Sequence, residues 1–252
     1  IVNQGFEFML YSTPIQTKDF TFDLNVNLSK NVSKVKELAD GVDYIFFNGD
    51  ANFPINVGTR VGHRLGEIYA KSLYKRDENG NVIVNKQGRP TKVSGEDAFQ
   101  YTLDNPIGNI EPDLLMSVSP SFTYKGFTLS ALFDMKFGGD IVSVSEAMAT
   151  STGLAERTGN RGNAENGWTI VAPGVTADGT ANTTAMKAQR YYTSMSGMAE
   201  EFVYDASFIK LKELSIGYSF PKSLLKKTPL TSLNVAFVAR NLAYLMKHTP
   251  GT

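Results

Sequence analysis

Residues 114–137 read LLMSVSPSFTYKGFTLSALFDMKF, with apolar and polar residues alternating on both sides of Lys125-Gly126. With these two residues as a tight turn, the flanking segments fold back on each other as a β-hairpin. Apolar residues then face apolar residues in the pairs Tyr124–Phe127, Phe122–Leu129, Pro120–Ala131, Val118–Phe133, Met116–Met135 and Leu114–Phe137. The other face is small and mostly polar, with the pairs Thr123–Thr128, Ser121–Ser130, Ser119–Leu132 and Ser117–Asp134. A slip of one residue would exchange the two faces, so the pattern predicts a single register.

The length of these strands indicates a membrane. Each is about 11 residues long, roughly twice the average for soluble proteins, and about 9–11 residues carry a tilted β-strand across a bilayer. No run of 18 consecutive apolar residues occurs, so a membrane protein of this composition must be a barrel. The alternative is one sheet of a soluble all-β module, such as a glycan-binding sandwich.

The same alternation recurs along the chain. It predicts strands over residues 6–11, 20–29, 208–220 and 233–240, which makes six long strands with the central hairpin. Connections alternate between short (14–19, 125–126 and 221–232) and long (30–113 and 138–204). A small hairpin is expected in the first long connection, with residues 72–76 and 82–85 around a turn at 78–81, and a helical turn or two at 143–149 in the second. Short turns on one side and long loops on the other are typical of outer-membrane barrels.

Two further features concern the strand ends. Lys210 and Lys212 share the parity of Leu214, so either a β-bulge shifts the register or these lysines lie beyond the hydrocarbon layer. Aromatic residues gather near the short turns, as an interfacial girdle requires. They are Phe20, Tyr124, Phe127, Tyr218 and Phe220.

Composition excludes several classes of function. Twenty-five basic and twenty-five acidic side chains balance, so no nucleic-acid partner is expected. Cysteine is absent, and His63 and His248 lie far apart without a second ligand at metal spacing, so no metal site or other cofactor is expected. Neither a nucleophile elbow nor a phosphate-binding glycine loop occurs, so we expect no enzyme.

Two groups of residues are candidates for solute contact. Trp168, Tyr191 and Tyr192 in the second long connection could stack against a sugar or peptide, although packing of the loop is the alternative explanation. Four charged residues on the polar faces of strands could line a solute path, or could instead pair across strands. These are Glu7, Asp23, Asp134 and Arg240.

Several stretches resemble one family. Residues 205–221, DASFIKLKELSIGYSFP, are similar to the D-x-SF-x-(K/R)-L-(K/R)-x-x-S-x-GY-x-x-P segment near the end of the barrel in SusC/RagA proteins, the TonB-dependent outer-membrane transporters of Bacteroidetes. Residues 124–140, 61–69 and 3–7 resemble the family too. An acidic D-x-N-x-D-G-like run found in many members is replaced here by GEDAFQYTLDNPIGNIEPD, so no calcium loop is inferred.

This resemblance implies that residues 1–252 are a C-terminal portion of a 22-stranded transmembrane β-barrel with long extracellular loops. The plug, the TonB box and a last strand would lie outside this chain. The whole protein would import oligosaccharides or peptides, with a SusD-like surface lipoprotein over the barrel and TonB acting through another part. The short turns would then be periplasmic, and the connections 30–113 and 138–204 would lie outside the cell.

Overall fold

The protein is a long antiparallel sheet with a mixed module at one end. The computed structural model describes residues 1–47 and 54–250, so residues 48–53 of the first long connection and the last two residues lie outside the described part. The sheet has the order β1-β2-β9-β10-β15-β16. Its strands are β1 (Val2–Gln16), β2 (Phe20–Lys34), β9 (Leu114–Tyr124), β10 (Phe127–Phe137), β15 (Phe208–Ser219) and β16 (Asn234–Lys247).

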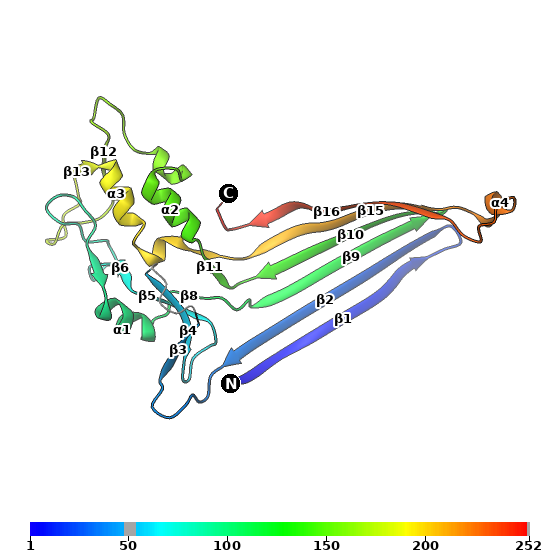
Figure 1. Ribbon diagram of the computed structural model, residues 1–252, viewed down its shortest axis with the longest axis horizontal. Helices are drawn as coiled ribbons and strands as arrows, with labels where there is room; N and C mark the ends of the chain where they lie inside the picture. The colour runs from blue at the N-terminus through cyan, green and yellow to red at the C-terminus, as the bar shows by residue number, and fades with distance from the viewer. Residues whose placement is uncertain (48–53, 251–252) are drawn as a thin grey trace.

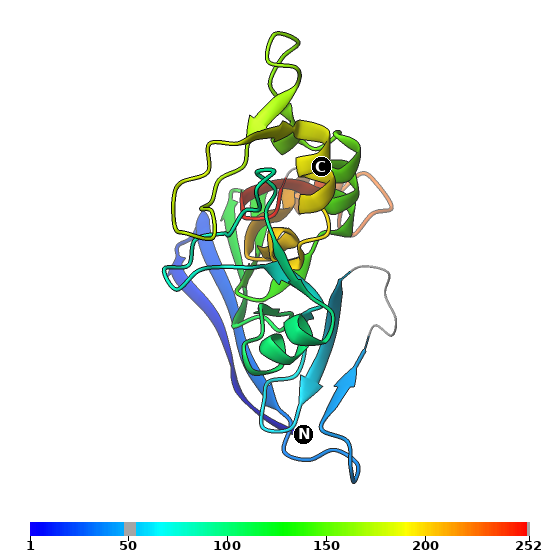
Figure 2. The same ribbon diagram turned by 90° about the vertical axis from the view of Figure 1, so that its left-hand side faces the viewer.

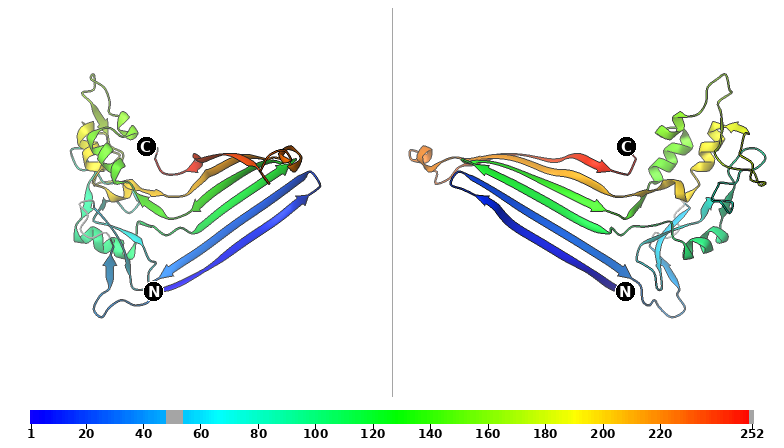
Figure 3. Two further views of the ribbon diagram at one scale, coloured as in Figure 1. Left: turned by 45° about the vertical axis from the view of Figure 1, so that its right-hand side comes forward. Right: turned by 180° about the vertical axis from the view of Figure 1, so that it is seen from behind.

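The two ends of this sheet differ (Figure 1). At one end, the turn end, consecutive strands are joined directly, or through the short helix α4 (Lys222–Leu225) between β15 and β16. At the other end, the loop end, residues 35–47, 54–113 and 138–207 form a separate mass, which we call the loop module. Figure 3 shows the loop module and α4 at opposite ends of the strands in two further views. The predicted alternation of short and long connections is confirmed.

The central hairpin has the predicted register. Tyr124 pairs with Phe127, Val118 with Phe133, and Leu114 with Phe137. Lys125 and Gly126 both have positive φ, of 46° and 90°, as a two-residue hairpin turn requires. The neighbouring strands extend the rows, because Val26 pairs with Val118 and Leu211 pairs with Phe133.

The outer strands are longer than the alternation predicted. The prediction ended the second strand near Ser29, whereas β2 continues to Lys34, which pairs with Val2. The mostly polar segment 29–34 (SKNVSK) breaks the alternation without breaking the backbone ladder, which depends on N–H and C=O groups rather than on side chains. The alternation in the sequence therefore marks only the part of each strand that has an apolar face, and the strands extend beyond that part.

A β-bulge at Lys212 explains why Lys210 and Lys212 share the sequence parity of the apolar Leu214. Leu132 pairs with Glu213 while Phe133 pairs with Leu211, so Lys212 is the extra residue on β15. This shift puts Leu211 in the apolar row with Phe133. Lys212 Nζ instead donates to Asp134 Oδ2 at 2.9 Å, so its side chain is on the polar face. Of the two interpretations left open by the sequence, the bulge is the one observed.

The turn end carries a continuous row of aromatic rings. Phe20 pairs with Tyr124, Tyr124 with Phe127, and Phe127 with Tyr218. The Phe127 and Tyr218 ring centroids are 4.4 Å apart, and those of Tyr218 and Phe220 are 4.9 Å apart. This arrangement is the girdle that the sequence predicted.

The first half of the loop module, residues 35–113, has more secondary structure than the sequence indicated. Its described residues, 35–47 and 54–113, form the helix α1 (Glu96–Asp104) and six short strands. These strands are β3 (Tyr44–Phe46), β4 (Ile55–Arg60), β5 (Glu67–Ala70), β6 (Ser72–Tyr74), β7 (Lys92–Ser94) and β8 (Gly108–Asn109). Arg76 does bridge to Val82 around the predicted turn. The expected partner of residues 72–74 was wrong, however, because β6 pairs with β7.

The second half, residues 138–207, is built around two helices. These are α2 (Val144–Thr152), which the sequence predicted in part, and α3 (Ala188–Met195). Around them lie β11 (Asp140–Val142), η1 (Glu156–Gly159), β12 (Thr169–Val171), β13 (Ala185–Lys187), η2 (Ala199–Phe202) and β14 (Val203–Asp205). No helix among the described residues is long and apolar enough to cross a membrane.

The two halves of the loop module pack against each other. The Tyr74 N–H donates to Glu200 Oε1 at 2.8 Å, and Arg76 Nη2 donates to Glu200 Oε2 at 3.1 Å. Further along, the Val84 N–H donates to the Val175 carbonyl at 2.7 Å. Figure 2, which faces the loop module, shows the segments of both halves gathered in front of the strands. The fully buried side chains Tyr69, Ile68 and Phe202 belong to this module, so the core of the molecule lies there and not in the sheet.

Candidate functional site

All four charged candidates of the strands lie on the polar face of the sheet. Asp23 pairs with Ser121, and Asp134 pairs with Ser117. Glu7 pairs with Ser29, and Arg240 with Glu213. The opposite face of the same strands carries Val26, Val118 and Phe133. The structure thus places these residues on one face of the sheet, and their contact with a solute stays a prediction.

Three of the four have partners on neighbouring strands. Asp134 accepts from Lys212, Arg240 Nε donates to Glu213 Oε2 at 2.9 Å, and Thr13 Oγ1 donates to Asp23 Oδ1 at 2.7 Å. Cross-strand pairing, one of the two interpretations from the sequence, therefore describes three of them. These pairs are partly exposed, so their ion pairs contribute little to stability.

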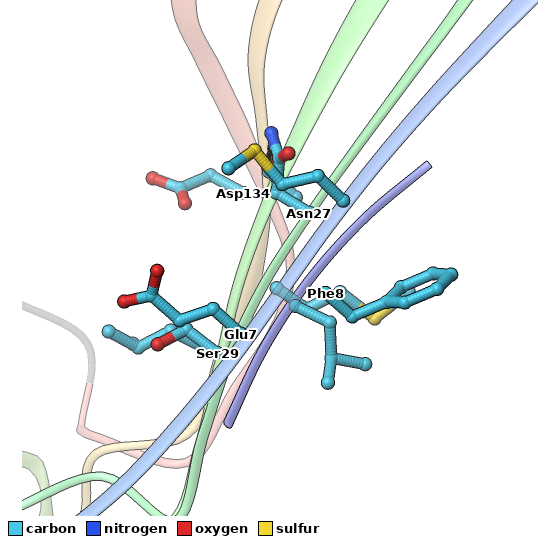
Figure 4. A pocket seen from close by; sticks show the side chains of 10 residues that line it. Glu7, Phe8, Asn27, Ser29 and Asp134 are labelled. Atoms are coloured by element: carbon cyan, nitrogen blue, oxygen red, sulfur yellow. Dashed lines mark hydrogen bonds between the residues drawn. The ribbon is translucent and has the colours of Figure 1, made fainter. Parts of the chain in front are cut away.

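Glu7 differs from the other three. Its side chain makes no hydrogen bond or ion pair with the described residues, and it lines a hollow of about 280 Å³ with Asn27, Ser117 and Asp134. Figure 4 shows the carboxylates of Glu7 and Asp134 on the same side of the sheet, with Phe8 on the opposite side. A carboxylate without a partner on the polar face is available to a solute.

The family-like segment 205–221 begins with a set of hydrogen bonds that joins three strand ends. Ser207 Oγ donates to Asp205 Oδ1 at 2.5 Å and accepts from the Gly138 N–H at 2.8 Å. His248, after β16, contacts the other Asp205 oxygen. The donors from Ser207 and His248 lower the pKa of Asp205 to about 2. We name Asp205, Ser207, Gly138 and His248 the strand-end clasp, since they join the loop ends of β10, β15 and β16.

Arg157 is the centre of the second half of the loop module. Its guanidinium lies 3.1 Å from Glu201 and 3.5 Å from Glu146, and it donates to the Tyr204 hydroxyl at 2.6 Å. The same group stacks over the Phe202 ring, 5.2 Å from its centroid. One side chain therefore connects η1 to α2, η2 and β14. No pattern in the sequence indicates this role.

Tyr191 and Tyr192, two of the predicted aromatic contacts, lie on the buried face of α3. They are 8% and 7% exposed. Burial, together with Glu201 and Tyr192, raises the pKa of Tyr191 to about 12. The Tyr192 hydroxyl donates to the carbonyls of Arg157 and Asn160. Packing, the alternative explanation, accounts for most of the surface of both rings.

Trp168 has the opposite environment. Its side chain is 52% exposed, and it lines a hollow of about 700 Å³ between α2 and α3. Tyr192 reaches the same hollow, whereas Tyr191 does not. Polar side chains that the sequence reasoning missed also line it, namely Thr150, Thr158, Arg161 and Gln189. The described residues contain no group of three His, Asp or Glu side chains that could hold a metal ion.

Comparisons with known proteins agree with this geometry. No family model matches the chain. TonB-dependent receptor P3 of Formosa agariphila is 26% identical over 95% of this chain and 24% of its own length. TonB-dependent receptor SusC of Bacteroides thetaiotaomicron is 27% identical over 86% of this chain and 20% of its own length. The chain therefore spans about a quarter of the length of these relatives.

Solved structures give the same fold. The match to the RagAB peptide transporter covers 98% of this chain and 26% of the transporter chain, with a TM-score of 0.64 and 19% sequence identity. The RagAB peptide importer in its open-open state matches with a TM-score of 0.62 and 17% identity. The relatives are receptors and transporters rather than enzymes. In sequence the chain is therefore similar to part of the outer-membrane TonB-dependent receptors that include SusC, and in fold it is similar to part of the RagAB transporter barrel.

Proposed function

We propose that the protein containing this chain imports oligosaccharides or peptides across the outer membrane, and that this chain is part of its barrel wall and extracellular surface. The observation that carries the proposal is the six-stranded sheet with two different faces. One face is apolar and ends in an aromatic row, and the other carries paired charges and hydroxyls. Such a sheet fits a wall between lipid and a water-filled lumen.

The orientation follows from the connections. Outer-membrane barrels have short periplasmic turns and longer extracellular loops, so the turn end is assigned to the periplasm and the loop module to the outside. The loop module would then be the first part of this chain that an arriving solute meets. Glu7 and Asp134 would follow on the lumen face, close to the loop end of the strands.

Two partners are part of the proposal. A SusD-like surface lipoprotein would cover the loop module, and TonB would act through a part of the protein outside this chain. The similarity to SusC and to the RagAB transporter supports the first partner, and the similarity to receptors that carry TonB in their names supports the second. The chain itself acts by binding and guiding solute, without catalysis.

Deletion of the gene in its host tests the import function. The deletion strain should fail to grow on one oligosaccharide or peptide source while it grows normally on the corresponding monomers. Uptake should return when the full-length gene is restored. Unchanged growth on every oligosaccharide and peptide source would contradict import, and recovery of the full-length protein in the soluble fraction without detergent would support the alternative of a soluble glycan-binding module.

A further inference from the structure

We propose that the hollow between α2 and α3 is a saccharide-binding site in which Trp168 stacks on a pyranose ring. This inference rests on the proposed import function and narrows its substrate class from oligosaccharides or peptides to oligosaccharides. We call this surface the Trp168 hollow. It is defined by Thr150, Thr158, Arg161, Trp168, Gln189 and Tyr192.

The indole of Trp168 is held in an exposed position by its backbone. Its φ of 57° lies in the left-handed region, which a bulky residue seldom adopts and which is concentrated at binding sites. The Trp168 N–H donates to the Asn163 carbonyl at 2.8 Å, and the Trp168 carbonyl accepts from the Ala188 N–H at 3.0 Å. Both bonds fix the backbone while the ring stays half exposed. A preorganised aromatic face costs little conformational entropy when a ligand stacks on it.

Polar groups surround this ring in the mixture that a sugar needs. Arg161 Nε donates to the Thr158 carbonyl at 2.8 Å, and its Nη2 donates to the Gly153 carbonyl at 2.9 Å, so the guanidinium is fixed in place. Gln189 is exposed at the start of α3 and carries both a donor and an acceptor. Hydroxyl groups of a pyranose both donate and accept, so they can use all of these.

The walls of the hollow favour a saccharide over a peptide. Extended peptides commonly add to the free edge of a β-strand through their backbone. The lining residues come instead from α2, η1, the coil that follows each of them, α3 and the turn before β12, and none belongs to a strand. An aromatic ring with hydroxyl, amide and guanidinium groups offers stacking and side-chain hydrogen bonds.

The test uses the full-length receptor in detergent micelles. It is applied to an array that carries oligosaccharides of plant, algal, fungal and animal polysaccharides, with random hexapeptides on the same surface. We expect capture by a subset of the oligosaccharides. Trp168→Ala should lower the affinity for them by about tenfold or more, as loss of a central aromatic anchor does, and Trp168→Phe should restore part of it.

The control is Leu154→Ala, because Leu154 is 82% exposed nearby and does not line the hollow. This variant should bind as the wild type does. Gln189→Ala removes an exposed polar contact without disturbing the core, so it keeps the test valid if Trp168→Ala fails to fold. The proposal would be overturned if neither Trp168→Ala nor Gln189→Ala lowered the affinity for the captured oligosaccharides. It would also be overturned if only hexapeptides captured the receptor, or if nothing on the array did. Import would survive those results, since only the growth phenotype of the deletion strain decides it.

Discussion

Placing an arginine on the apolar face of β9 should destabilise the protein far more than placing it on the polar face. Val118 lies in the apolar row with Val26 and Phe133, six positions along β9 from Tyr124 in the aromatic row. At about 3.3 Å per residue and a strand tilt of about 40°, this separation is roughly 15 Å along the membrane normal. The apolar band of such barrels is about 25 Å tall, so Val118 lies near its middle.

Val118→Arg should therefore cost about 2–4 kcal/mol of unfolding free energy, the penalty for arginine at the midplane. Ser119→Arg, one residue away, projects from the polar face beside Asn25 and should cost about 0.5 kcal/mol or less, as for a surface substitution. The assay is the guanidinium unfolding midpoint of the full-length protein in lipid vesicles. Equal penalties at the two positions would refute the assignment of the faces and indicate a sheet buried on both sides.

Three further changes test the turn, the loop module and the strand-end clasp. Gly126→Ala should cost roughly 1–3 kcal/mol, because φ is +90° and a Cβ would lie 2.8 Å from the Ser219 carbonyl oxygen; the unfolding midpoint measures it. Arg157→Ala should loosen the loop module by roughly 1–3 kcal/mol, seen as faster proteolysis within residues 138–207, and unchanged cleavage would contradict its central role. Asp205→Asn should lower the melting temperature at pH 7. Because the folded-state pKa of Asp205 is depressed to about 2, its contribution is present above about pH 4 and is lost as the pH falls toward 2; a difference that persists at pH 2 would contradict this.

The sheet could be predicted from the sequence because its two faces meet different solvents. Such a sheet needs strict alternation over its whole crossing, as in the pairs from Tyr124–Phe127 to Met116–Met135. Even the β-bulge at Lys212 was indicated by the sequence, because the charged Lys210 has the same parity as the apolar Leu214. The continuation of β2 beyond Ser29 left no such sign, because the backbone ladder there continues without an alternation of apolar and polar side chains.

The loop module was less predictable because its elements are short and stabilise one another. Some signals were nevertheless readable. Ala98, Phe99, Thr102 and Leu103 are the buried residues of α1, and Tyr191, Tyr192 and Met195 lie on the buried face of α3. Both sets have the spacing of an amphipathic helix, which would have assigned the two tyrosines to a core.

The polar lining of the Trp168 hollow had no such signal. Thr150 lies in α2, Gln189 in α3 and Arg161 in the coil after η1, and only the tertiary packing of these segments brings them together. The prediction from sequence named Trp168, with Tyr191 and Tyr192, because an aromatic ring in the second long connection could stack on a sugar or peptide. Neighbours that depend on tertiary packing leave no period in the sequence.

Epitope accessibility on intact cells tests the central claim, that these strands span the outer membrane with the loop module outside. Tags inserted near Asn79 and near Asn182 lie in the two halves of the loop module, and a tag at Lys125 lies at the turn end. An antibody applied to intact cells should label the first two and miss the third, which should become reachable only after the outer membrane is permeabilised. If the antibody labels only the Lys125 tag on intact cells, the topology is the reverse of the one proposed. If it labels none of the three tags on intact cells, although all three are labelled after permeabilisation, the result would contradict a membrane-spanning sheet with the loop module outside.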